Sequence, residues 1–163
     1  MKTRLLIASF ALLFLCASIY LGTGLSLVLF SFPIAPRLTP ENYYMQFVPQ
    51  VHAATQFFTY MTTLMIALAI LMLVTEWRTK LRWVPITVLA GVIAATALTV
   101  LVIFPYNQEM ASGIKDSGRL AVVLGKWMTL NRIRVAIWVV QWLAMMAYFG
   151  IKTIRYEEAS HAG

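Results

Sequence analysis

Four long intervals of the sequence contain no Asp, Glu, Lys or Arg, and they constrain the fold more than any other feature. An α-helix needs about 20 apolar residues, at a rise of about 1.5 Å each, to cross the hydrocarbon core of a bilayer. Three of the intervals exceed that length. The fourth contains 17 residues, so its helix is expected to begin earlier, near Leu120 or Lys126. The intervals are Leu5–Pro36, Asn42–Thr75, Trp83–Gln108 and Val135–Ile151.

Composition agrees with a chain that lies in lipid. Hydrophobic residues make up 61% of the sequence and charged residues 12%, whereas a soluble domain carries roughly 25% charged residues. The apolar runs are continuous and do not alternate with polar residues, which excludes a transmembrane β-barrel. We therefore predict an all-α integral membrane protein of one domain, residues 1–163. Its four-helix bundle is expected at approximately 5–31, 52–75, 83–104 and 122–151.

The basic residues predict the direction of the crossings, because Lys and Arg concentrate in cytoplasmic segments. The short link between the second and third helices, Glu76–Trp83, contains three basic residues, and Trp77 and Trp83 bracket it as interfacial anchors. The two opposite connections are longer. The first, Ser31–Val51, contains four prolines and is expected to be an irregular loop with one short interfacial helix through Tyr43, Tyr44 and Phe47. We predict that both termini are cytoplasmic and that the chain is a multi-pass protein of the cell membrane.

Several function classes are excluded at this level. The net charge of +7 is spread over the ends of the apolar runs, which is the pattern of membrane orientation, so no nucleic-acid partner is expected. One cysteine, Cys16, and two histidines cannot form a Cys/His metal cluster. The sequence contains no phosphate-binding glycine loop, His-Glu-x-x-His motif or nucleophile elbow. No metal and no cofactor are predicted.

Small residues at four-residue spacing predict where helices approach each other closely. Such residues occur once in the first apolar run and once in the third. Both sets are expected to face another helix inside the bundle. The two sets are Ser18, Gly22 and Ser26, and Gly91, Ala95 and Thr99.

Two polar stripes at similar outer depth predict a shared interior. When the fourth helix is projected at 100° per residue, the side chains of one stripe all lie within about 40° of a common direction. The polar side chains of this stripe are costly to place in hydrocarbon. Arg132 points away from this direction and is expected to reach the headgroups. The stripes enclose either a site or a hydrogen-bond network that fixes helix register. They consist of Trp127, Asn131, Arg134, Trp138, Gln141 and Met145 on the fourth helix, and His52, Gln56, Thr59, Tyr60 and Thr63 on the second.

Two further residues have open interpretations. His52 is the histidine near the bundle, since His161 lies in the polar tail, and an imidazole can act as a general base. A single buried histidine is also often a hydrogen-bonding structural residue. Asn107 follows Pro105 at the end of the third helix, where it either lines a site or caps a turn.

The second half of the chain resembles the anthrone-oxygenase-like family of small four-helix membrane proteins. The resemblance rests on Pro105-Tyr106-Asn107 and on Trp127-x-x-x-Asn131-x-x-Arg134, together with a small-residue first helix that ends in Pro33 and Pro36. It implies oxidation of anthrones to anthraquinones by molecular oxygen, without a metal or flavin.

The resemblance also implies roles for individual residues. His52 would remove a proton from an activated carbon, and Asn131 and Arg134 would stabilise the resulting anion. The aromatic or quinone-like ligand would stack on Trp127 and Trp138. The remaining predicted ligand-binding residues are Gln56, Tyr60, Asn107 and Gln141.

Two other function classes compete with an oxygenase. One is a non-enzymatic accessory or scaffold subunit, whose polar stripes would pack against a membrane protein partner or a second copy of the chain. The other is a small oligomeric transporter, which would need a polar path across the bilayer. The inner half of the second helix is apolar and the third offers only threonines, so the transporter ranks last. An enclosed outer cavity would favour the ligand-binding enzyme.

Overall fold

Helices form every regular element of the computed structural model, which describes residues 2–161. Helix α1 (Lys2–Ser26) continues into a π-helical turn, η1 (Leu27–Ser31), and a 3₁₀ turn, η2 (Ala35–Arg37), follows. Helix α2 comprises Tyr43–Glu76. Helix α3 (Trp83–Leu98) runs through the π-helical η3 (Thr99–Ile103) into α4 (Phe104–Ala111), and α5 comprises Ser117–His161. The all-α four-helix prediction is confirmed.

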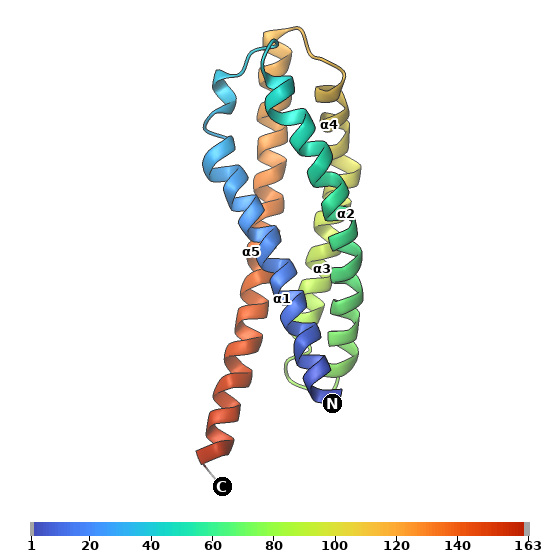
Figure 1. Ribbon diagram of the computed structural model, residues 1–163, viewed down its shortest axis with the longest axis vertical. Coiled ribbons are helices and arrows are strands. Elements are labelled where there is room, and N and C mark those ends of the chain that lie inside the picture. Colours follow the sequence, from blue (N-terminus) through green and yellow to red (C-terminus); the bar gives the residue numbers. More distant parts are fainter. Residues whose placement is uncertain (1, 162–163) are drawn as a thin grey trace.

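The four long helical segments run antiparallel to their neighbours in chain order (Figure 1). The N-terminus and the α2–α3 link lie at one end of the bundle, here termed the inner end. The two longer connections lie at the opposite, outer end, and α5 projects beyond the bundle at the inner end. Helix α5 packs against α1 and α3, and α2 packs against α1, α3 and α4.

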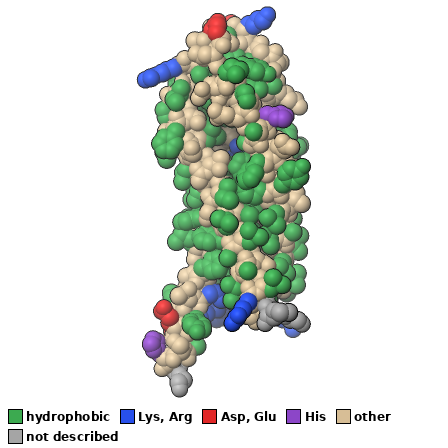
Figure 2. Space-filling view, in the orientation of Figure 1, with side chains coloured by type: hydrophobic (Ala, Val, Ile, Leu, Met, Phe, Trp, Pro, Cys, Tyr) green, Lys and Arg blue, Asp and Glu red, His purple; other side chains and the backbone are tan. Residues whose placement is uncertain are grey.

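The surface of the bundle is apolar along most of its length. Figure 2 shows green side chains around the middle of this face, with charged side chains gathered at the two ends. Four helical segments are long and apolar enough to cross a bilayer: Thr3–Ser31, Tyr43–Glu76, Trp83–Ala111 and Ser117–His161. Exposed apolar side chains on these segments match lipid, since a soluble protein buries most of its large apolar residues. The chain is a membrane protein.

Buried side chains form two apolar clusters. The inner cluster includes Leu13, Met65, Met72, Val88 and Met145, each no more than 1% exposed. The outer cluster is built around the start of α2 and the start of α5. It includes Tyr43, Phe47, Ile103, Met110 and Trp127.

Helix α2 begins nine residues before the expected start at 52, at Tyr43. The prediction of an irregular loop up to Val51 is therefore wrong, and the short interfacial helix expected at Tyr43 is the first turn of α2. Pro49 lies inside this helix, at a cost of about 3 kcal/mol in a typical helix interior. Tyr43 and Phe47 are one turn apart and both buried, so packing into the outer cluster offsets the lost backbone hydrogen bond.

The last span is longer than the expected 122–151 at both ends. Its start is stabilised by Asp116, whose Oδ1 accepts a hydrogen bond from the backbone N–H of Arg119 at 2.6 Å. A carboxylate in this position satisfies a free amide of the first turn and interacts favourably with the helix dipole. The third span also continues past the expected 104, because Pro105 occupies the first turn of α4, where a missing N–H costs nothing.

Small residues are close-packed at two places, of which one was predicted. A Cβ on Gly91 would lie 2.6 Å from Cγ of Gln141, so α3 and α5 meet closely there as expected. The prediction for Gly22 is wrong, because a Cβ there would meet nothing within 4 Å. The close-packed glycine of α1 is Gly24, where a Cβ would lie 2.7 Å from Cε3 of Trp138.

Candidate functional site

A cavity of about 630 Å³ lies in the outer half of the bundle, between the inner and outer clusters. All four spans contribute to its wall. Arg134 is the one charged side chain among the lining residues. It lies 18 residues before Lys152 on α5, or about 27 Å along the helix. Because a hydrocarbon core is about 30 Å thick, the cavity reaches the outer boundary of the core.

The guanidinium of Arg134 is held by two neutral partners. Its Nη2 donates to Oδ1 of Asn131 at 2.5 Å, and its Nη1 donates to Oγ1 of Thr99 at 3.2 Å. Its Nε is buried and has no hydrogen-bond partner among the described residues. The ion pairs found in residues 2–161 are Arg119–Glu109 and Lys152–Glu76, so no carboxylate there neutralises Arg134. The cavity therefore contains a positive charge with unused donor capacity.

Asn131 orients this arginine. It is fully buried, and its Nδ2 donates to the backbone carbonyl of Trp127 at 2.8 Å, which turns Oδ1 towards Arg134. The indole Nε1 of Trp127 in turn donates to Oδ1 of Asn107 at 2.8 Å. Asn107 thus bonds to α5 across the bundle. The candidate ligand site and the structural hydrogen-bond network are therefore the same group of residues. The hydrogen bonds that fix helix register also position the guanidinium of Arg134.

Aromatic rings form the wall next to the guanidinium. Cζ of Arg134 lies 4.8 Å from the ring centroid of Trp138, within the range of a cation–π interaction. The ring of Tyr20 lies 4.9 Å from Trp138 and 4.5 Å from Phe58. The Tyr20 hydroxyl is engaged with Oγ1 of Thr62 at 2.5 Å. These flat apolar faces suit a flat apolar ligand.

Threonines supply most of the remaining polar atoms, and they act as acceptors. The hydroxyls of Thr55, Thr59, Thr63 and Thr99 each donate to the carbonyl four residues earlier on their own helix. Their hydrogens are therefore used, and only oxygen lone pairs and methyl groups face the cavity. Arg134 remains the strong hydrogen-bond donor of the site.

Gln141 forms the inner floor of the cavity. It is 2% exposed, and its Nε2 donates to the backbone carbonyl of Val88 at 2.9 Å. The absence of a side chain at Gly91 leaves the space that the Gln141 amide occupies.

Of the predicted site residues, the structure brings Asn107, Trp127, Trp138 and Gln141 to the cavity together with Arg134. Asn131 stands directly behind Arg134. Their functional roles stay predictions.

The structure does not bring the predicted residues of α2 to this cavity. His52, Gln56 and Tyr60 are exposed on the outside of the bundle and are absent from its lining. At 100° per residue they lie about 120–160° from Phe58, which faces inward. The prediction of a histidine base inside a shared site is wrong for this geometry. Thr59 and Thr63, from the same predicted stripe, do line the cavity.

Sequence reasoning missed Tyr20, Phe58 and Thr99. Tyr20 had a signal, since it is the one tyrosine of the uncharged first run. Phe58 had none, because its residue type is equally common on lipid-facing surfaces.

Compared with protein families, curated proteins and solved structures, the chain matches none. The chemistry of the cavity therefore carries the functional argument.

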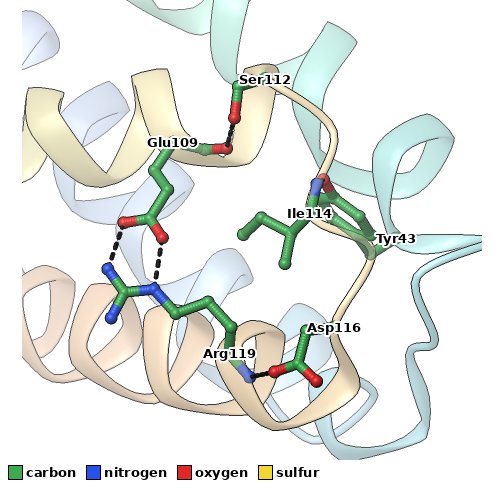
Figure 3. Close-up of polar contacts among 6 residues, drawn as sticks. All are labelled: Tyr43, Glu109, Ser112, Ile114, Asp116 and Arg119. Carbon is green, nitrogen blue, oxygen red and sulfur yellow. Dashed lines mark hydrogen bonds and ion pairs between the residues drawn. The ribbon is translucent and has the colours of Figure 1, made fainter.

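Hydrogen bonds join α2, the α4–α5 loop and α5 at the outer end of the bundle (Figure 3). The buried Tyr43 hydroxyl donates to the carbonyl of Met110 at 2.9 Å and accepts from the backbone N–H of Ile114 at 2.5 Å. Nearby, Arg119 donates from Nε and Nη2 to the two carboxylate oxygens of Glu109, at 2.5 and 2.9 Å. We call these five residues the outer cap. They tie the start of α2 to both sides of the α4–α5 loop.

Proposed function

We propose that this protein binds, in the outer half of the cell membrane, a planar hydrophobic molecule that carries an acidic oxygen. The observation that supports the proposal is the guanidinium of Arg134, which faces an apolar cavity without a carboxylate partner and with its Nε unused. A charge at this depth is costly. An anionic oxygen would satisfy the free donor and offset the charge.

The size and wall of the cavity favour a flat ligand. A volume of about 630 Å³ falls in the range of roughly 300–1,000 Å³ that holds drug-sized ligands. Trp138, Tyr20 and Phe58 offer ring faces beside the guanidinium. The sequence resemblance to the anthrone-oxygenase-like family supports a quinone-like molecule.

Binding is favoured over general-base oxidation. Among residues 2–161, no Asp, Glu or His side chain lines the cavity, so none of these residues places an ordinary carboxylate or imidazole base beside a ligand bound there. An oxidation in this cavity would require the ligand to lose its acidic proton to solvent. Arg134 would then stabilise the enolate-like anion of the ligand.

A second candidate function rests on a separate observation. His52, Gln56 and Tyr60 form a polar and aromatic stripe on the outer surface of α2, outside the cavity. Such a stripe suits an accessory subunit that packs against a membrane protein partner or a second copy of the chain.

The binding proposal can be tested with two matched probes, pyrene-1-carboxylate and pyrene. In vesicles containing the protein, quenching of tryptophan fluorescence reports binding of each. A hydrogen bond to a charged group contributes about 1.5–3 kcal/mol, so Arg134→Leu should weaken pyrene-1-carboxylate binding by roughly 10–100-fold. Binding of neutral pyrene should change little.

Arg132→Leu is the matched control for this experiment. Arg132 is exposed, two residues away on the same helix, and lies over the ring of Phe32 at 5.4 Å from its centroid. This variant should bind both probes as the unaltered protein does. Equal affinity of Arg134→Leu and the unaltered protein for the carboxylate would contradict the proposal.

A further inference from the structure

Buried side chains pack at both ends of the cavity, and Gln50 of its lining is exposed on the outer part of α2. At the outer end, Tyr43 and Met110 of the outer cap are no more than 1% exposed, and Trp127 below them is 3% exposed. At the inner end, Met65 and Met145 are equally buried. A water-soluble ligand that enters at either end would have to displace these buried side chains or pass beside Gln50.

The two seams beside α5 are closed. Between α1 and α5, Gly24 packs directly against Trp138, and the indole N–H of Trp142 donates to the hydroxyl of Ser18 at 3.1 Å. Between α3 and α5, Gly91 packs against Gln141. The remaining candidate openings are the two seams beside α2.

Helix α2 separates from α1 but stays with its other neighbours. In Figure 1, α1 and α2 diverge towards the outer end, whereas α2 contacts α3 and α4 in turn. The α1–α2 contact includes the hydrogen bond between Tyr20 and Thr62. Beyond it, Thr23 and Ser26 line the cavity and are nevertheless exposed. Figure 2 shows a recess on this face, in the upper half of the view, with a basic side chain visible inside it.

The α1–α2 opening lies at the level of the outer leaflet. Thr23 is 19 residues after Arg4, or about 28 Å along a helix, which is close to the outer boundary of a 30 Å hydrocarbon core. The acidic group of a membrane-dissolved amphiphile rests at this boundary, and its apolar body rests in the core. Arg134 lies at a similar depth inside the cavity. A ligand moving sideways from the leaflet would keep its orientation.

We infer that the ligand is an anionic amphiphile already dissolved in the outer leaflet, and that it reaches Arg134 laterally between α1 and α2. The inference rests on the proposed function and adds the class of ligand and its route.

The route can be blocked after folding is complete. Thr23→Cys in a Cys16→Ala background provides a single thiol at the opening, and alkylation with N-benzylmaleimide would fill it. With pyrene-1-carboxylate in the same bilayer, stopped-flow fluorescence should show association and dissociation slowed together by tenfold or more, while the Kd changes less than threefold. Each sample before alkylation is its own control.

Two further single-cysteine variants in the same background separate the alternatives. Leu29→Cys places the thiol on the exposed surface of η1, outside the cavity lining, and its alkylation should leave the rates unchanged. Thr96→Cys tests the α2–α3 seam, because Thr96 is an exposed lining residue about 140° around α3 from Gly91, which faces α5. Because Thr96 also lines the cavity, alkylation there is expected to weaken binding, but it should not slow association as alkylation at Thr23→Cys does.

The possible results are distinct. Unchanged rates after alkylation at Thr23→Cys, or slowing at Thr96→Cys alone, would overturn the lateral α1–α2 route while leaving the binding proposal intact. Association that follows the aqueous probe concentration, and not its mole fraction in the bilayer, would overturn the route as well. No binding by the unaltered protein would overturn both proposals.

Discussion

Arg132 and Arg134 show how two residues of one type take opposite environments on one helix. They are two positions apart, so their side chains project about 200° from each other. Arg132 is exposed and lies over the ring of Phe32, as expected for a side chain that reaches the headgroups. Arg134 points into the cavity, where Asn131 and Thr99 hold it. The two arginines carry the same charge, so the difference in their environments follows from the direction in which each side chain projects from α5.

Gly24 and Gly22 provide a matched pair for a prediction about packing. In Gly24→Ala the new methyl group would lie 2.7 Å from Cε3 of Trp138 and from Cγ2 of Val135, so α1 and α5 must move apart. Overpacking of this kind costs about 1–3 kcal/mol. We expect a lower Tm in detergent and, because Trp138 moves, weaker binding of pyrene-1-carboxylate.

Gly22→Ala is the control, since its Cβ meets no atom within 4 Å. Alanine is favoured over glycine in a helix by up to about 1 kcal/mol, so the Tm should stay the same or rise. A Tm that falls equally in both variants would show that α1 packs differently from the structure described.

At the scale of elements, α2 is secured at both of its ends. Its first residue, Tyr43, joins the outer cap. Its last residue, Glu76, is 3% exposed, and its carboxylate accepts hydrogen bonds from Tyr148 at 2.8 Å and Thr79 at 2.6 Å and pairs with Lys152 at 2.9 Å. Between these points α2 borders the proposed opening. The cap at its first residue and the Tyr20–Thr62 hydrogen bond near its middle allow the outer part of α2 to stay apart from α1.

The outer end of α2 is tested by Tyr43→Phe. Removing the hydroxyl leaves the Ile114 N–H without its partner and leaves the Met110 carbonyl only the longer bond from Gly113 at 3.4 Å, and a buried unsatisfied group costs about 1–3 kcal/mol. We expect a lower Tm and faster hydrogen exchange at the amide of Ile114. Tyr44→Phe is the control, because Tyr44 is 39% exposed. Unchanged exchange at Ile114 in Tyr43→Phe would show that this hydrogen bond does not hold the cap.

The inner end of α2 is tested by Glu76→Gln. The substitution keeps the size of the side chain but removes the charge that pairs with Lys152 and one acceptor oxygen. Loss of hydrogen bonds to a charged group should lower the free energy of unfolding by about 1.5–3 kcal/mol, measured as a lower Tm in detergent. Glu157→Gln, on the exposed tail of α5, should melt as the unaltered protein does, and a matching decrease there would indicate a non-specific charge effect.

The two polar stripes explain how much of the site could be predicted from sequence. The α5 stripe faces inward as expected, since Gln141 lies at a depth where hydrocarbon would surround an outward-facing amide. His52 and Gln56 are different. Gln56 lies 21 residues before the interfacial Trp77, or about 32 Å along α2, beyond the hydrocarbon core. A polar side chain at this level can face the lipid headgroups at little cost. Its polarity therefore does not predict that it faces the interior of the bundle.

The helix boundaries show the same limit. Absence of charge indicates where a helix can cross the bilayer, and the four spans were predicted correctly on that basis. It does not indicate where a helix continues into the headgroup region. The first turns of α2 and the start of α5 depend on tertiary contacts, through Tyr43 and Phe47 with the outer cluster and through the capping residue Asp116. Those contacts join distant parts of the chain.

At the scale of the whole molecule, the structure makes the charge asymmetry between the two ends sharper. The inner end includes Arg78, Lys80 and Arg82, all exposed in the short α2–α3 link. On the outer side, Arg134 lies within α5 and points into the cavity, so it adds no charge to a loop. Basic residues in short loops determine orientation, so the inner end is the one that should face the cytoplasm.

Single cysteines in a Cys16→Ala background test this orientation. Ser112→Cys would lie in the outer connection and Ala159→Cys in the α5 tail, and both positions are exposed. In intact cells an impermeant maleimide should label Ser112→Cys alone, and Ala159→Cys should react only after the membrane is permeabilised. The orientation matters for function, because it places the cavity and its α1–α2 opening in the leaflet that faces away from the cytoplasm. Labelling of Ala159→Cys alone in intact cells would reverse the orientation and move the ligand source to the cytoplasmic leaflet, and labelling of both would contradict the four-span fold.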